Sequence, residues 1–554
     1  MVESPKPLRI VIVGGVAGGA SAATRARRAN AHAEITMLER NSVVSFANCG
    51  LPYHVGGEIE KRQSLIVAKR ELFWNRFRIK VRTRCEAIAI DRQAKTLSVV
   101  DCDSGESSSV PYDRLILATG AEPNVPAYCL PMPSNAFHLW TLADMDGIIA
   151  KLNQQEVKNA IVVGGGFVGI EVVEQLHRRG INVTLVERNP QILTRLDPIF
   201  AKIVENHLES KSISLQLGNP ITSLQIENGK AVRATLEDGQ RLDVDLLIIG
   251  AGVKPRVALA SQSGLSIGKD GGVLTNEFMQ TSDPNIYAVG DIVEYENGIT
   301  LKRGLNPLAG PANRSGRIAG THAATNKSLP MGPVFGTSIV RVFELTAACT
   351  GLNECGLKLN GFEFRTAIIQ AANHATYFPG AQSMQLKILY SPGDGKILGA
   401  QAVGGEGVDK RIDILATAMH FGATVYQLAQ LDLAYAPPYG SAKDPIHMAA
   451  FTACNDLQGL PTLSLPNADL TRMQIVDVRT AKEREQLPLA NAISIEVDEF
   501  PERLHELDPE RATLVVCHSG KRAHVAATRL RGVGFKVVFN LTGGMSIRSL
   551  TDRK

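Results

Sequence analysis

Residues 8–39 read LRIVIVGGVAGGASAATRARRANAHAEITMLE. A buried apolar run at 8–13 leads into a glycine-rich turn at 14–19, then a helix of small residues, then a second apolar run that ends in Glu39. Strand, glycine turn, helix, strand and terminal acid make up the fingerprint of a dinucleotide-binding βαβ unit, in which the acid accepts hydrogen bonds from ribose hydroxyls. The middle glycine of the usual pattern is Val16 here. Taken alone, this copy also fits a structural glycine turn in another kind of α/β unit.

A second copy of the pattern lies at 160–187, where the apolar run AIVV leads into GGGFVG and a later apolar run ends in Glu187. One G-x-G-x-x-G is a weak signal, whereas two copies that each sit in a βαβ pattern and end in an acid are a strong one. The two copies predict two Rossmann-like dinucleotide-binding domains. Glu187 favours NADH because a carboxylate repels the 2′-phosphate of NADPH, although the neighbouring Arg188 leaves NADPH open.

Two further segments extend this pattern. LILATG at 115–120 reads as a strand that ends in a glycine turn, and IYAVGD at 286–291 as a strand that ends in an acid. With these segments, residues 8–453 resemble the flavoprotein family of glutathione reductase, in which the first fingerprint binds FAD and the second binds NAD(P)H. The resemblance implies an α/β fold of glutathione-reductase type with an α+β dimerisation domain. It also implies that Asp291 holds the ribityl chain of FAD, and that a helix starting near Pro307 stabilises negative charge on the reduced flavin.

The same resemblance implies two sets of nucleotide-binding residues. Those for FAD are Gly14, Val16, Ala17, Gly19, Glu39, Arg40, Thr119, Gly120, Asp291, Pro307 and Ala309. Those for NADH, or NADPH, are Gly164, Gly166, Phe167, Val168, Gly169, Glu171, Glu187 and Gly252. None of the eight cysteines forms a C-x-x-C pair, and we expect no metal site.

The segment SFANCGLPYH at 45–54 contains a single cysteine, Cys49. Dithiol members of the family carry C-x-x-x-x-C here, but Val44 lies five residues before Cys49 and His54 lies five residues after it. A disulfide within this segment is therefore impossible. A redox cycle must instead join one protein sulfur to a small thiol, a persulfide sulfur or an oxygen.

Two subfamilies use a single thiol. NADH oxidases and peroxidases that form a sulfenic acid typically carry a His in the first glycine loop, and the loop at 14–19 has none. The segment around Cys49 and the stretch GGVAGGASAA instead resemble coenzyme A disulfide reductase, whose active cysteine forms a mixed disulfide with CoA. Arginine forks bind phosphate well, although a solvated helix face is the alternative for arginines of this helix. The resemblance implies four CoA-binding residues: Arg25, Arg28, Ser45 and Asn48.

Two tyrosines match the same subfamily. Tyr377 lies in NHATYFPG at 373–380, and Tyr435 begins the segment YAPPY. In that subfamily both motifs come from the partner subunit of a homodimer and their phenols reach the active thiol. A phenol can donate a proton to a leaving thiolate, so the resemblance implies that both tyrosines are catalytic. Packing at an interface is the alternative.

The tail at 474–554 carries another α/β pattern. Apolar runs at 475–479 and 513–516 read as strands, and Cys517 directly follows the second of them. A cysteine at such a place lies in a ring of backbone N–H groups that stabilises a thiolate or persulfide anion. The DVR strand, the C-x-x-G-x-R loop and the final GG resemble a single-domain rhodanese, in which the loop cysteine carries sulfane sulfur. The resemblance implies that Cys517 is catalytic, within a loop completed by His518, Ser519, Gly520, Lys521 and Arg522.

A cysteine phosphatase is the competing interpretation of this loop. Its C-x-x-x-x-x-R pattern would need the arginine one residue later than Arg522. Rhodanese is therefore favoured.

Composition bounds the remaining possibilities. The 554 residues are 44% hydrophobic and 21% charged, with a net charge of +4, which is ordinary for a globular protein and does not suggest nucleic-acid binding. We expect a cytoplasmic protein, because Met1–Leu8 lacks the apolar stretch of a signal peptide and no run approaches the ~20 apolar residues of a membrane helix. The expected domains are FAD-binding (8–150 and 251–324), NAD(P)H-binding (151–250), dimerisation (325–453), a linker (454–473) and rhodanese (474–554).

These features together predict FAD-dependent reduction of CoA persulfide or polysulfide by NAD(P)H. The expected intermediate is a Cys49–CoA mixed disulfide, with Cys517 as the sulfur carrier and small sulfur compounds as substrates. Three alternatives stay open. They are a CoA-disulfide reductase with an accessory rhodanese domain, a single-cysteine NADH oxidase or peroxidase, and a flavin-containing redox sensor that acts through partner proteins.

Overall fold

A computed structural model of the chain describes residues 6–154 and 157–551. Residues 1–5, 155–156 and 552–554 lie outside the described residues. The expectation about a signal peptide falls partly on the first of these stretches. The predicted NAD(P)H-binding and rhodanese domains include the other two.

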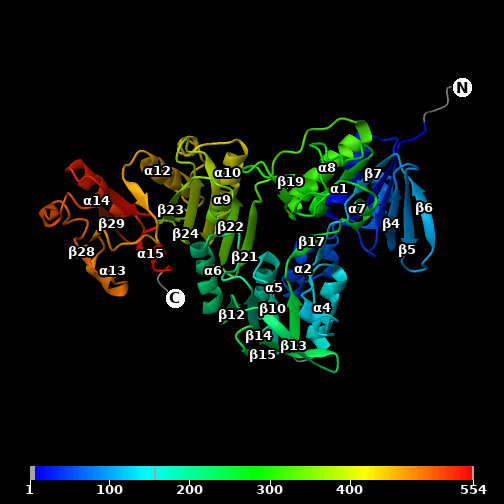
Figure 1. Cartoon of the computed structure of the whole chain (residues 1–554), viewed down its shortest axis with the longest axis horizontal. Coiled ribbons are helices and arrows are strands. Elements are labelled where there is room, and N and C mark those ends of the chain that lie inside the picture. The colour runs from blue at the N-terminus through cyan, green and yellow to red at the C-terminus, as the bar shows by residue number, and fades with distance from the viewer. Residues whose placement is uncertain (1–5, 155–156, 552–554) are drawn as a thin grey trace. The chain divides into compact units, whose positions relative to one another are not determined.

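The chain divides into two compact units (Figure 1). The first unit, called unit 1, consists of residues 1–188 and 216–336. The second, called unit 2, consists of residues 189–215 and 337–554. Each unit is described by itself below.

The first parallel sheet of unit 1 is built around β1 (Arg9–Val13), with the strand order β18-β7-β1-β2-β3. All neighbouring strands in it are parallel. Ile10 and Ile12 are fully buried, as expected for an apolar run in a sheet that is covered on both faces. The other strands are β2 (Glu34–Glu39), β3 (Ile79–Thr83), β7 (Arg114–Leu117) and β18 (Ile286–Ala288).

Two helices of unit 1, α1 (Ala17–Ala29) and α8 (Ala309–Thr325), pack directly against each other. A Cβ atom added at Gly316 would lie 2.3 Å from the backbone oxygen of Gly18. Glycine at this point of α8 therefore lets the two helices approach backbone to backbone. The contact joins the start of the first fingerprint to the segment that follows β18.

The second parallel sheet of unit 1 repeats the design of the first. Within the unit its strand order is β11-β10-β16-β9, and all these pairs are parallel. The helix α5 (Phe167–Arg178) follows β10 as α1 follows β1, so the two fingerprints fold alike. The strands are β9 (Ala136–Phe137), β10 (Asn159–Val163), β11 (Asn182–Glu187) and β16 (Leu246–Ile249).

Smaller elements complete unit 1. Its further helices are α2 (Leu51–Val55), α3 (Arg70–Phe77), α4 (Leu142–Gln154) and α7 (Ala258–Gln262). Its antiparallel sheets combine β4 (Cys85–Asp91), β5 (Thr96–Asp101) and β6 (Ser107–Pro111), then β13 (Ile221–Glu227), β14 (Lys230–Leu236) and β15 (Arg241–Asp243). Its two-stranded pairs are β8 (Ala121–Pro123) with β17 (Val253–Pro255), and β19 (Glu294–Glu296) with β20 (Arg303–Leu305).

An antiparallel sheet with the strand order β21-β22-β25-β24-β23 forms the core of unit 2. This mixed layer of strands and helices confirms the expected α+β dimerisation domain. The strands are β21 (Ser338–Val342), β22 (Leu345–Gly351), β23 (Arg365–Ala372), β24 (Ser383–Tyr390) and β25 (Ile397–Gly404). The helices are α6 (Pro198–Ser210), α9 (Glu354–Leu359), α10 (Val408–His420), α11 (Val425–Leu428) and α12 (Pro445–Leu457).

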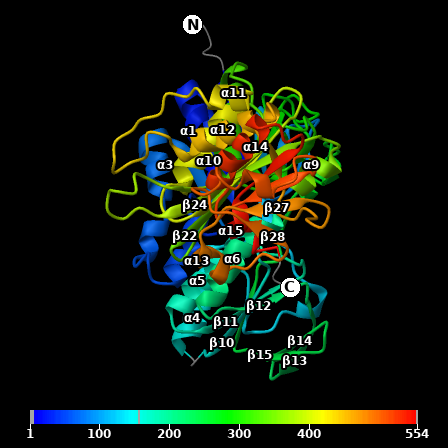
Figure 2. The ribbon, with the colours of Figure 1, turned by 90° about the vertical axis from the view of Figure 1, so that its left-hand side faces the viewer.

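The tail forms a parallel sheet in unit 2 with the strand order β26-β30-β29-β27-β28, and Figure 2 shows several of its elements. This agrees with the expected α/β rhodanese fold. The strands are β26 (Thr462–Ser464), β27 (Gln474–Asp477), β28 (Ala492–Ser494), β29 (Thr513–Val516) and β30 (Val538–Leu541). The helices are α13 (Ala481–Gln486), α14 (Lys521–Gly532) and α15 (Gly544–Arg548).

The predicted linker at 454–473 is wrong in its first half. The helix α12 continues to Leu457, and Thr462–Ser464 is the edge strand β26, which pairs with β30. A polar, proline-bearing stretch gives no sign of this pairing, because the partner strand lies about 75 residues further along the chain and only the tertiary fold brings it alongside.

Candidate active site

The first fingerprint folds as a tight turn between β1 and α1. Gly14 has φ +101°, and a Cβ atom there would lie 2.1 Å from the backbone oxygen of Ala118, so glycine is required. The buried carboxylate of Glu39 accepts a 2.8 Å hydrogen bond from the backbone N–H of Gly15 and bonds from the backbone and side chain of Asn41 at 2.9 and 2.8 Å. Glu39 therefore braces the turn from inside, in addition to the predicted contact with a ribose.

The second fingerprint has the same internal brace. Gly164 has φ +102°, and Glu187 accepts a 2.7 Å hydrogen bond from the backbone N–H of Gly165. A Cβ atom at Gly164 would lie 2.3 Å from a backbone oxygen, whereas a Cβ atom at Gly166 would meet nothing within 4 Å. The protein's own packing does not explain Gly166, and a dinucleotide pyrophosphate that approaches the backbone at this point does explain it. The residues present therefore fit a nicotinamide dinucleotide.

The predicted flavin-facing residues gather around the turn after β18. Burial raises the pKa of Asp291 to about 6. The buried hydroxyl of Tyr295 donates to the backbone oxygen of Gly290 at 2.9 Å and lies 2.9 Å from the hydroxyl of Ser315 on α8, so this network fixes the turn against that helix. The side-chain oxygen of Asn306, next to the expected flavin residue Pro307, is buried without a hydrogen-bond partner among the described residues. Ribityl hydroxyls or flavin N–H groups would provide hydrogen-bond partners for the side chains of Asp291 and Asn306, so the site fits FAD.

Cys49 lies in a short 3-10 turn, Asn48–Gly50, which runs directly into α2. Cys49 is exposed to solvent. The pKa of the Cys49 thiol is raised, first by desolvation and then by the negative charge of Glu171. A hydrogen-bond donor or a positive charge brought close to the sulfur by a bound group would favour the thiolate.

Tyr53, four residues after Cys49, connects the thiol segment to the second fingerprint. Its hydroxyl donates a 3.1 Å hydrogen bond to the carboxylate of Glu171 on α5. The sequence pattern alone assigns no role to Tyr53. Glu171, predicted from the resemblance as an NAD-binding residue, thus lies beside the segment that contains the thiol.

The predicted CoA-binding residues lie on α1 and in the loop after β2. Arg25 donates a 2.9 Å hydrogen bond to the hydroxyl of Thr321 on α8, and the guanidinium of Arg28 stacks 5.2 Å from the ring of Phe77. Arg25 therefore packs against α8, and Arg28 packs against the end of α3. Ser45 adopts φ +49°, a conformation that is held by a 2.8 Å hydrogen bond from its N–H to Gly15.

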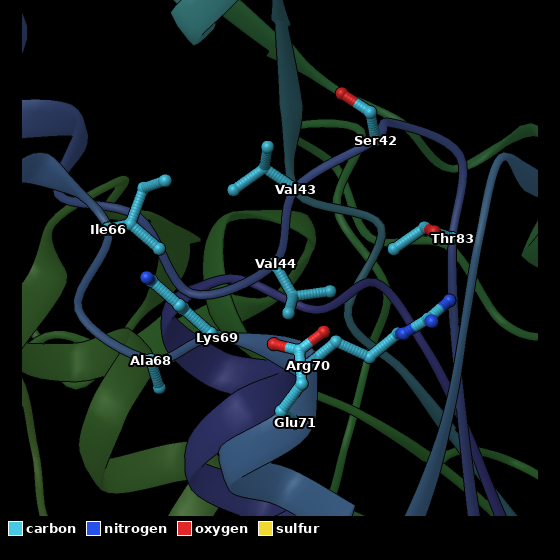
Figure 3. A pocket seen from close by; sticks show the side chains of 9 residues that line it. All are labelled: Ser42, Val43, Val44, Ile66, Ala68, Lys69, Arg70, Glu71 and Thr83. Atoms are coloured by element: carbon cyan, nitrogen blue, oxygen red, sulfur yellow. The ribbon is translucent and has the colours of Figure 1, made fainter. Parts of the chain in front are cut away.

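A pocket of about 250 Å³ opens beside the loop that follows β2 (Figure 3). Ser42, Val43 and Val44 line it on the side of this loop, and Thr83 lies at the end of β3. The stretch Lys69–Glu71 at the start of α3 also lines it. Ligands of parallel α/β sheets bind outside the carboxyl ends of the strands, which is where this pocket lies. Sequence reasoning missed Lys69 and the pocket, because no motif marks them.

The two predicted tyrosines meet in unit 2. The phenol oxygens of Tyr377 and Tyr435 lie 2.9 Å apart, and the side chains are 74% and 48% exposed. Their hydrogen bond raises the pKa of Tyr377. Cys49 belongs to unit 1, so the structure brings the two tyrosines together without relating them to the thiol.

Cys517 lies between β29 and α14 and is 1% exposed. The backbone N–H of Gly520, which has φ +89°, donates a 3.1 Å hydrogen bond to the sulfur, as an anion-stabilising loop requires. Arg522 of the same loop interacts with the Cys517 sulfur. Its guanidinium is also paired with Glu483 at 2.5 and 2.8 Å, and this lowers the pKa of Glu483 to about 2. Glu483 therefore offsets part of the positive charge that Arg522 brings to the loop.

The end of the rhodanese fold is hydrogen-bonded to β23 of the dimerisation domain. The hydroxyl of Thr542 accepts from the backbone N–H of Ile368 at 2.7 Å and lies 3.2 Å from the backbone oxygen of the same residue. The N–H of Gly543 also donates to Ile368, at 3.0 Å. Two residues further on, Met545 donates to the backbone oxygen of Cys517 at 2.8 Å. The active loop of the tail is thus linked through this turn to the central sheet of unit 2.

In residues 6–154 and 157–551, no three His, Cys, Asp or Glu side chains are grouped so that they could hold a metal ion. Within the same ranges, no helix has both the length and the apolar character needed to cross a membrane.

Residues 8–327 match the pyridine nucleotide-disulphide oxidoreductase family, 337–445 match the dimerisation domain of that family, and 465–546 match the rhodanese-like domain. A coenzyme A disulfide reductase of Staphylococcus haemolyticus is 33% identical over 446 residues, which cover 80% of this chain and 99% of that protein.

Two solved structures resemble the chain over nearly its whole length. A reduced Bacillus anthracis protein described as CoADR-RHD is 39% identical, with a TM-score of 0.95, over 98% of both chains. A NAD-dependent persulfide reductase from A. fulgidus is 35% identical, with a TM-score of 0.92, over 98% of this chain and 100% of that one. A water-forming NADH oxidase from Lactobacillus brevis, 22% identical with a TM-score of 0.78, shares the fold. The chain therefore belongs to the pyridine nucleotide-disulphide oxidoreductase family, a family of enzymes that bind FAD and a nicotinamide dinucleotide, and it carries a C-terminal rhodanese-like domain.

Proposed function

We propose that this enzyme uses NADH to reduce the sulfane sulfur of CoA persulfide or polysulfide. For CoA persulfide the balanced reaction is CoA–S–SH + NADH + H⁺ → CoA–SH + H₂S + NAD⁺. The observation that carries the proposal is the single thiol, Cys49, in a segment that Tyr53 and Glu171 tie to the nicotinamide fingerprint. The similarity to a persulfide reductase and to CoA disulfide reductases supports it.

We propose that the residues around the first fingerprint hold FAD. Glu39 would bind a ribose, Asp291 the ribityl chain, and the start of α8 at Ala309 would face the flavin. FAD, when bound, supplies the transfer of reducing equivalents from the nicotinamide to the sulfur centre. The pocket at Ser42–Val44 and Lys69–Glu71 would add room for the adenosine end of a bound nucleotide.

Cys49 would hold CoA as a mixed disulfide between reaction cycles. Arg25 and Arg28 of α1 would bind phosphates of CoA, while Ser45 and Asn48 would position the pantetheine end beside the sulfur. Guanidinium groups bind phosphate bidentately, which supports this assignment of the arginines.

Tyr377 and Tyr435 would donate a proton to the thiolate that leaves Cys49. In the related reductases that the sequence resembles, these tyrosines come from the partner subunit, so the proposal includes a homodimer formed through the dimerisation domain at 337–445. The high exposure of both phenols within one chain is what such an arrangement requires.

Cys517 would receive sulfane sulfur from a donor and hold it as a persulfide before it passes to CoA or to Cys49. The N–H of Gly520 is placed to stabilise that anion. Because the Cys517 side chain is 1% exposed, a donor must reach it through a local opening of the loop. The fused rhodanese domain favours sulfane sulfur over CoA disulfide as the substrate.

We propose NADH as the preferred reductant. The carboxylate of Glu187 is buried at the end of β11 and already accepts the N–H of Gly165. A 2′-phosphate placed there would meet a fixed negative charge, while Arg188 next to it could partly offset that charge.

The domain borders remain proposals. The FAD-binding parts are taken as 8–150 and 251–324, the NAD(P)H-binding domain as 151–250 and the dimerisation domain as 325–453. The rhodanese domain begins with β26 at Thr462 in place of 474, because this strand pairs with β30.

The deciding experiment combines a mass measurement with substrate turnover. The native protein should carry the added mass of CoA on Cys49, and NADH should be oxidised faster with CoA persulfide or polysulfide than with CoA disulfide. Cys49→Ser should abolish turnover of all three. An added oxygen on Cys49, with consumption of hydrogen peroxide, would show a peroxidase and overturn the proposal.

The contribution of the tail is tested separately with Cys517→Ala. This variant should retain reduction of CoA disulfide and lose the use of a sulfane-sulfur donor such as thiosulfate. If Cys517→Ala retained every activity with sulfane-sulfur donors, the proposed role of Cys517 as a sulfur carrier would be wrong. The reaction would then depend on Cys49 alone.

A further inference from the structure

Two loops of unit 2 carry the tyrosines. The first, residues 373–382, connects β23 to β24 and holds Tyr377. The second, residues 429–444, connects α11 to α12 and holds Tyr435. Exposed side chains on irregular loops lose conformational entropy when their positions are fixed, so a 2.9 Å separation between two such phenols needs support from elsewhere.

The bases of the two loops are hydrogen-bonded to each other. The backbone N–H of Ala375, two residues before Tyr377, donates a 2.9 Å bond to the backbone oxygen of Gly440. The first loop is closed across its neck, where Asn373 accepts from the N–H of Gln382 at 2.8 Å. The loops therefore form one structure below the phenols.

Arg411 of α10 lies beneath both loops and is 1% exposed. One of its terminal nitrogens donates to the backbone oxygen of Asn373 at 2.8 Å and to the carboxylate of Asp444 at 2.7 Å, and its Nε donates to Asp444 at 3.2 Å. Asn373 begins the first loop and Asp444 ends the second. A single planar guanidinium thus fixes the separation of the two loop ends.

Asp444 also caps the helix that follows its loop. It is buried, and its carboxylate accepts a 3.0 Å bond from the N–H of Ile446, which caps the N-terminus of α12. The second loop is thereby anchored to a helix on one side and to Arg411 on the other. Buried ion pairs often add little stability compared with apolar replacements, so the contribution of this pair lies in the geometry that it fixes.

We propose that Arg411 and Asp444 are positioning residues, a buried clamp that holds Tyr377 and Tyr435 at the separation they need to act together on the leaving thiolate. The catalytic part of this inference rests on the proposed function of the two tyrosines. The structural part, that the clamp sets the phenol pair, stands without it.

The test removes the clamp without leaving a buried charge unpaired. Arg411→Met combined with Asp444→Asn neutralises both partners, and asparagine retains the ability to cap α12. The protein is labelled with 3-fluorotyrosine, and the fluorine resonance of Tyr377 is assigned as the one missing in Tyr377→Phe. In the double variant this resonance should move to the position that it takes in Tyr435→Phe.

Turnover provides the second readout. Displacing a catalytic group by about 1 Å can cost up to ~100-fold in rate, so kcat with CoA persulfide should fall at least ~10-fold. Reduction of the bound flavin by NADH should be unchanged, because the nicotinamide fingerprint is not altered. A general loss of stability would lower both turnover of CoA persulfide and flavin reduction by NADH, whereas loss of the clamp should lower turnover alone.

A second buried ion pair in the same unit is the matched control. Lys387 lies 2.6 Å from Asp197 and is also buried, with Glu354 as its other partner. Lys387→Met combined with Asp197→Asn should cost comparable stability and leave the Tyr377 resonance in place. If the double variant at Arg411 and Asp444 does not fold, Arg411→Lys keeps the charge, removes the planar fork and gives the same readouts.

The outcomes separate the clamp from the function. An unchanged Tyr377 resonance in the clamp variants overturns the inference, whatever the rate. A moved resonance with unchanged turnover supports the clamp and shows that the proposed role of the tyrosines is wrong. A moved resonance with reduced turnover supports both.

Discussion

The phenol oxygens of Tyr377 and Tyr435 lie 2.9 Å apart, although the two residues are 58 positions apart in the chain. Tyr377 is largely exposed and Tyr435 about half exposed, and each belongs to a loop whose base is held by the Arg411–Asp444 pair. Two hydroxyls at this distance form a hydrogen bond, in which one phenol donates to the other. This relationship gives the first prediction.

Tyr435→Phe should shift the alkaline limit of turnover downward. The hydrogen bond that Tyr377 donates to Tyr435 raises the pKa of Tyr377, so a Tyr377 that acts as the proposed proton donor stays protonated to higher pH while this bond is present. Without that bond the phenol ionises at lower pH, and kcat should begin to fall earlier as pH rises. The pH profile of kcat for CoA persulfide checks this, and Tyr377→Phe should lower kcat by about 100-fold at all pH values. A profile that Tyr435→Phe leaves unmoved would contradict the pairing.

Asp291→Asn should stabilise the FAD-free protein at pH 8 and have little effect at pH 4. Burial raises the pKa of Asp291 to about 6, so folding favours the protonated acid. Its contribution is fully present below the ordinary pKa and is lost as pH rises through 6, because the buried group must then ionise. The difference amounts to about 3 kcal/mol at most. Thermal unfolding of FAD-free protein at the two pH values measures it, and the variant should also bind FAD more weakly. Equal shifts at both pH values would refute this explanation.

Two glycines of the second fingerprint should respond differently to alanine. Gly164→Ala places a Cβ atom 2.3 Å from a backbone oxygen at φ +102°, so it should destabilise the protein by more than ~2 kcal/mol. Gly166→Ala meets nothing within 4 Å and should fold normally, yet raise the dissociation constant for NADH about tenfold because the pyrophosphate approaches there. Thermal unfolding and NADH titration separate the two effects. Native NADH affinity in Gly166→Ala would argue against this binding site.

Thr542→Val should loosen the rhodanese domain from β23 without changing the side-chain shape. The variant leaves the backbone N–H of Ile368 without its 2.7 Å acceptor, at a cost of about 1–3 kcal/mol. Hydrogen exchange should accelerate in peptides that contain Ile368 and in those from 541 to 546, while thiosulfate sulfurtransferase activity persists. Ser549→Ala, which removes a hydroxyl bond to Ser546 near the end of α15, is the control and should leave Ile368 protected. Unchanged exchange at Ile368 in Thr542→Val would show that the hydroxyl does not secure the domain.

Sequence patterns predicted secondary structure correctly where a single short segment contains all the residues that specify it. Both glycine turns, their strands and their helices formed as expected, because an apolar run, a glycine with positive φ and a following helix are specified by neighbouring residues. The internal braces at Glu39 and Glu187 were not anticipated, since each acid was interpreted through a ligand and not through the adjacent turn. The prediction of a linker at 454–473 was wrong because it considered only local composition. The strand β26 forms by pairing with β30, which lies far along the chain.

The sequence by itself determined the local setting of the two cysteines. Cys49 has no partner cysteine within its segment, and Cys517 directly follows an apolar strand, so both features can be read from neighbouring residues. Only the tertiary structure decided what surrounds them. Glu171 comes beside the Cys49 segment, Glu483 pairs with Arg522, and Arg411 joins the ends of two loops. These contacts join residues that are far apart in the sequence, and packing and electrostatic pairing select them only once the sheets have assembled.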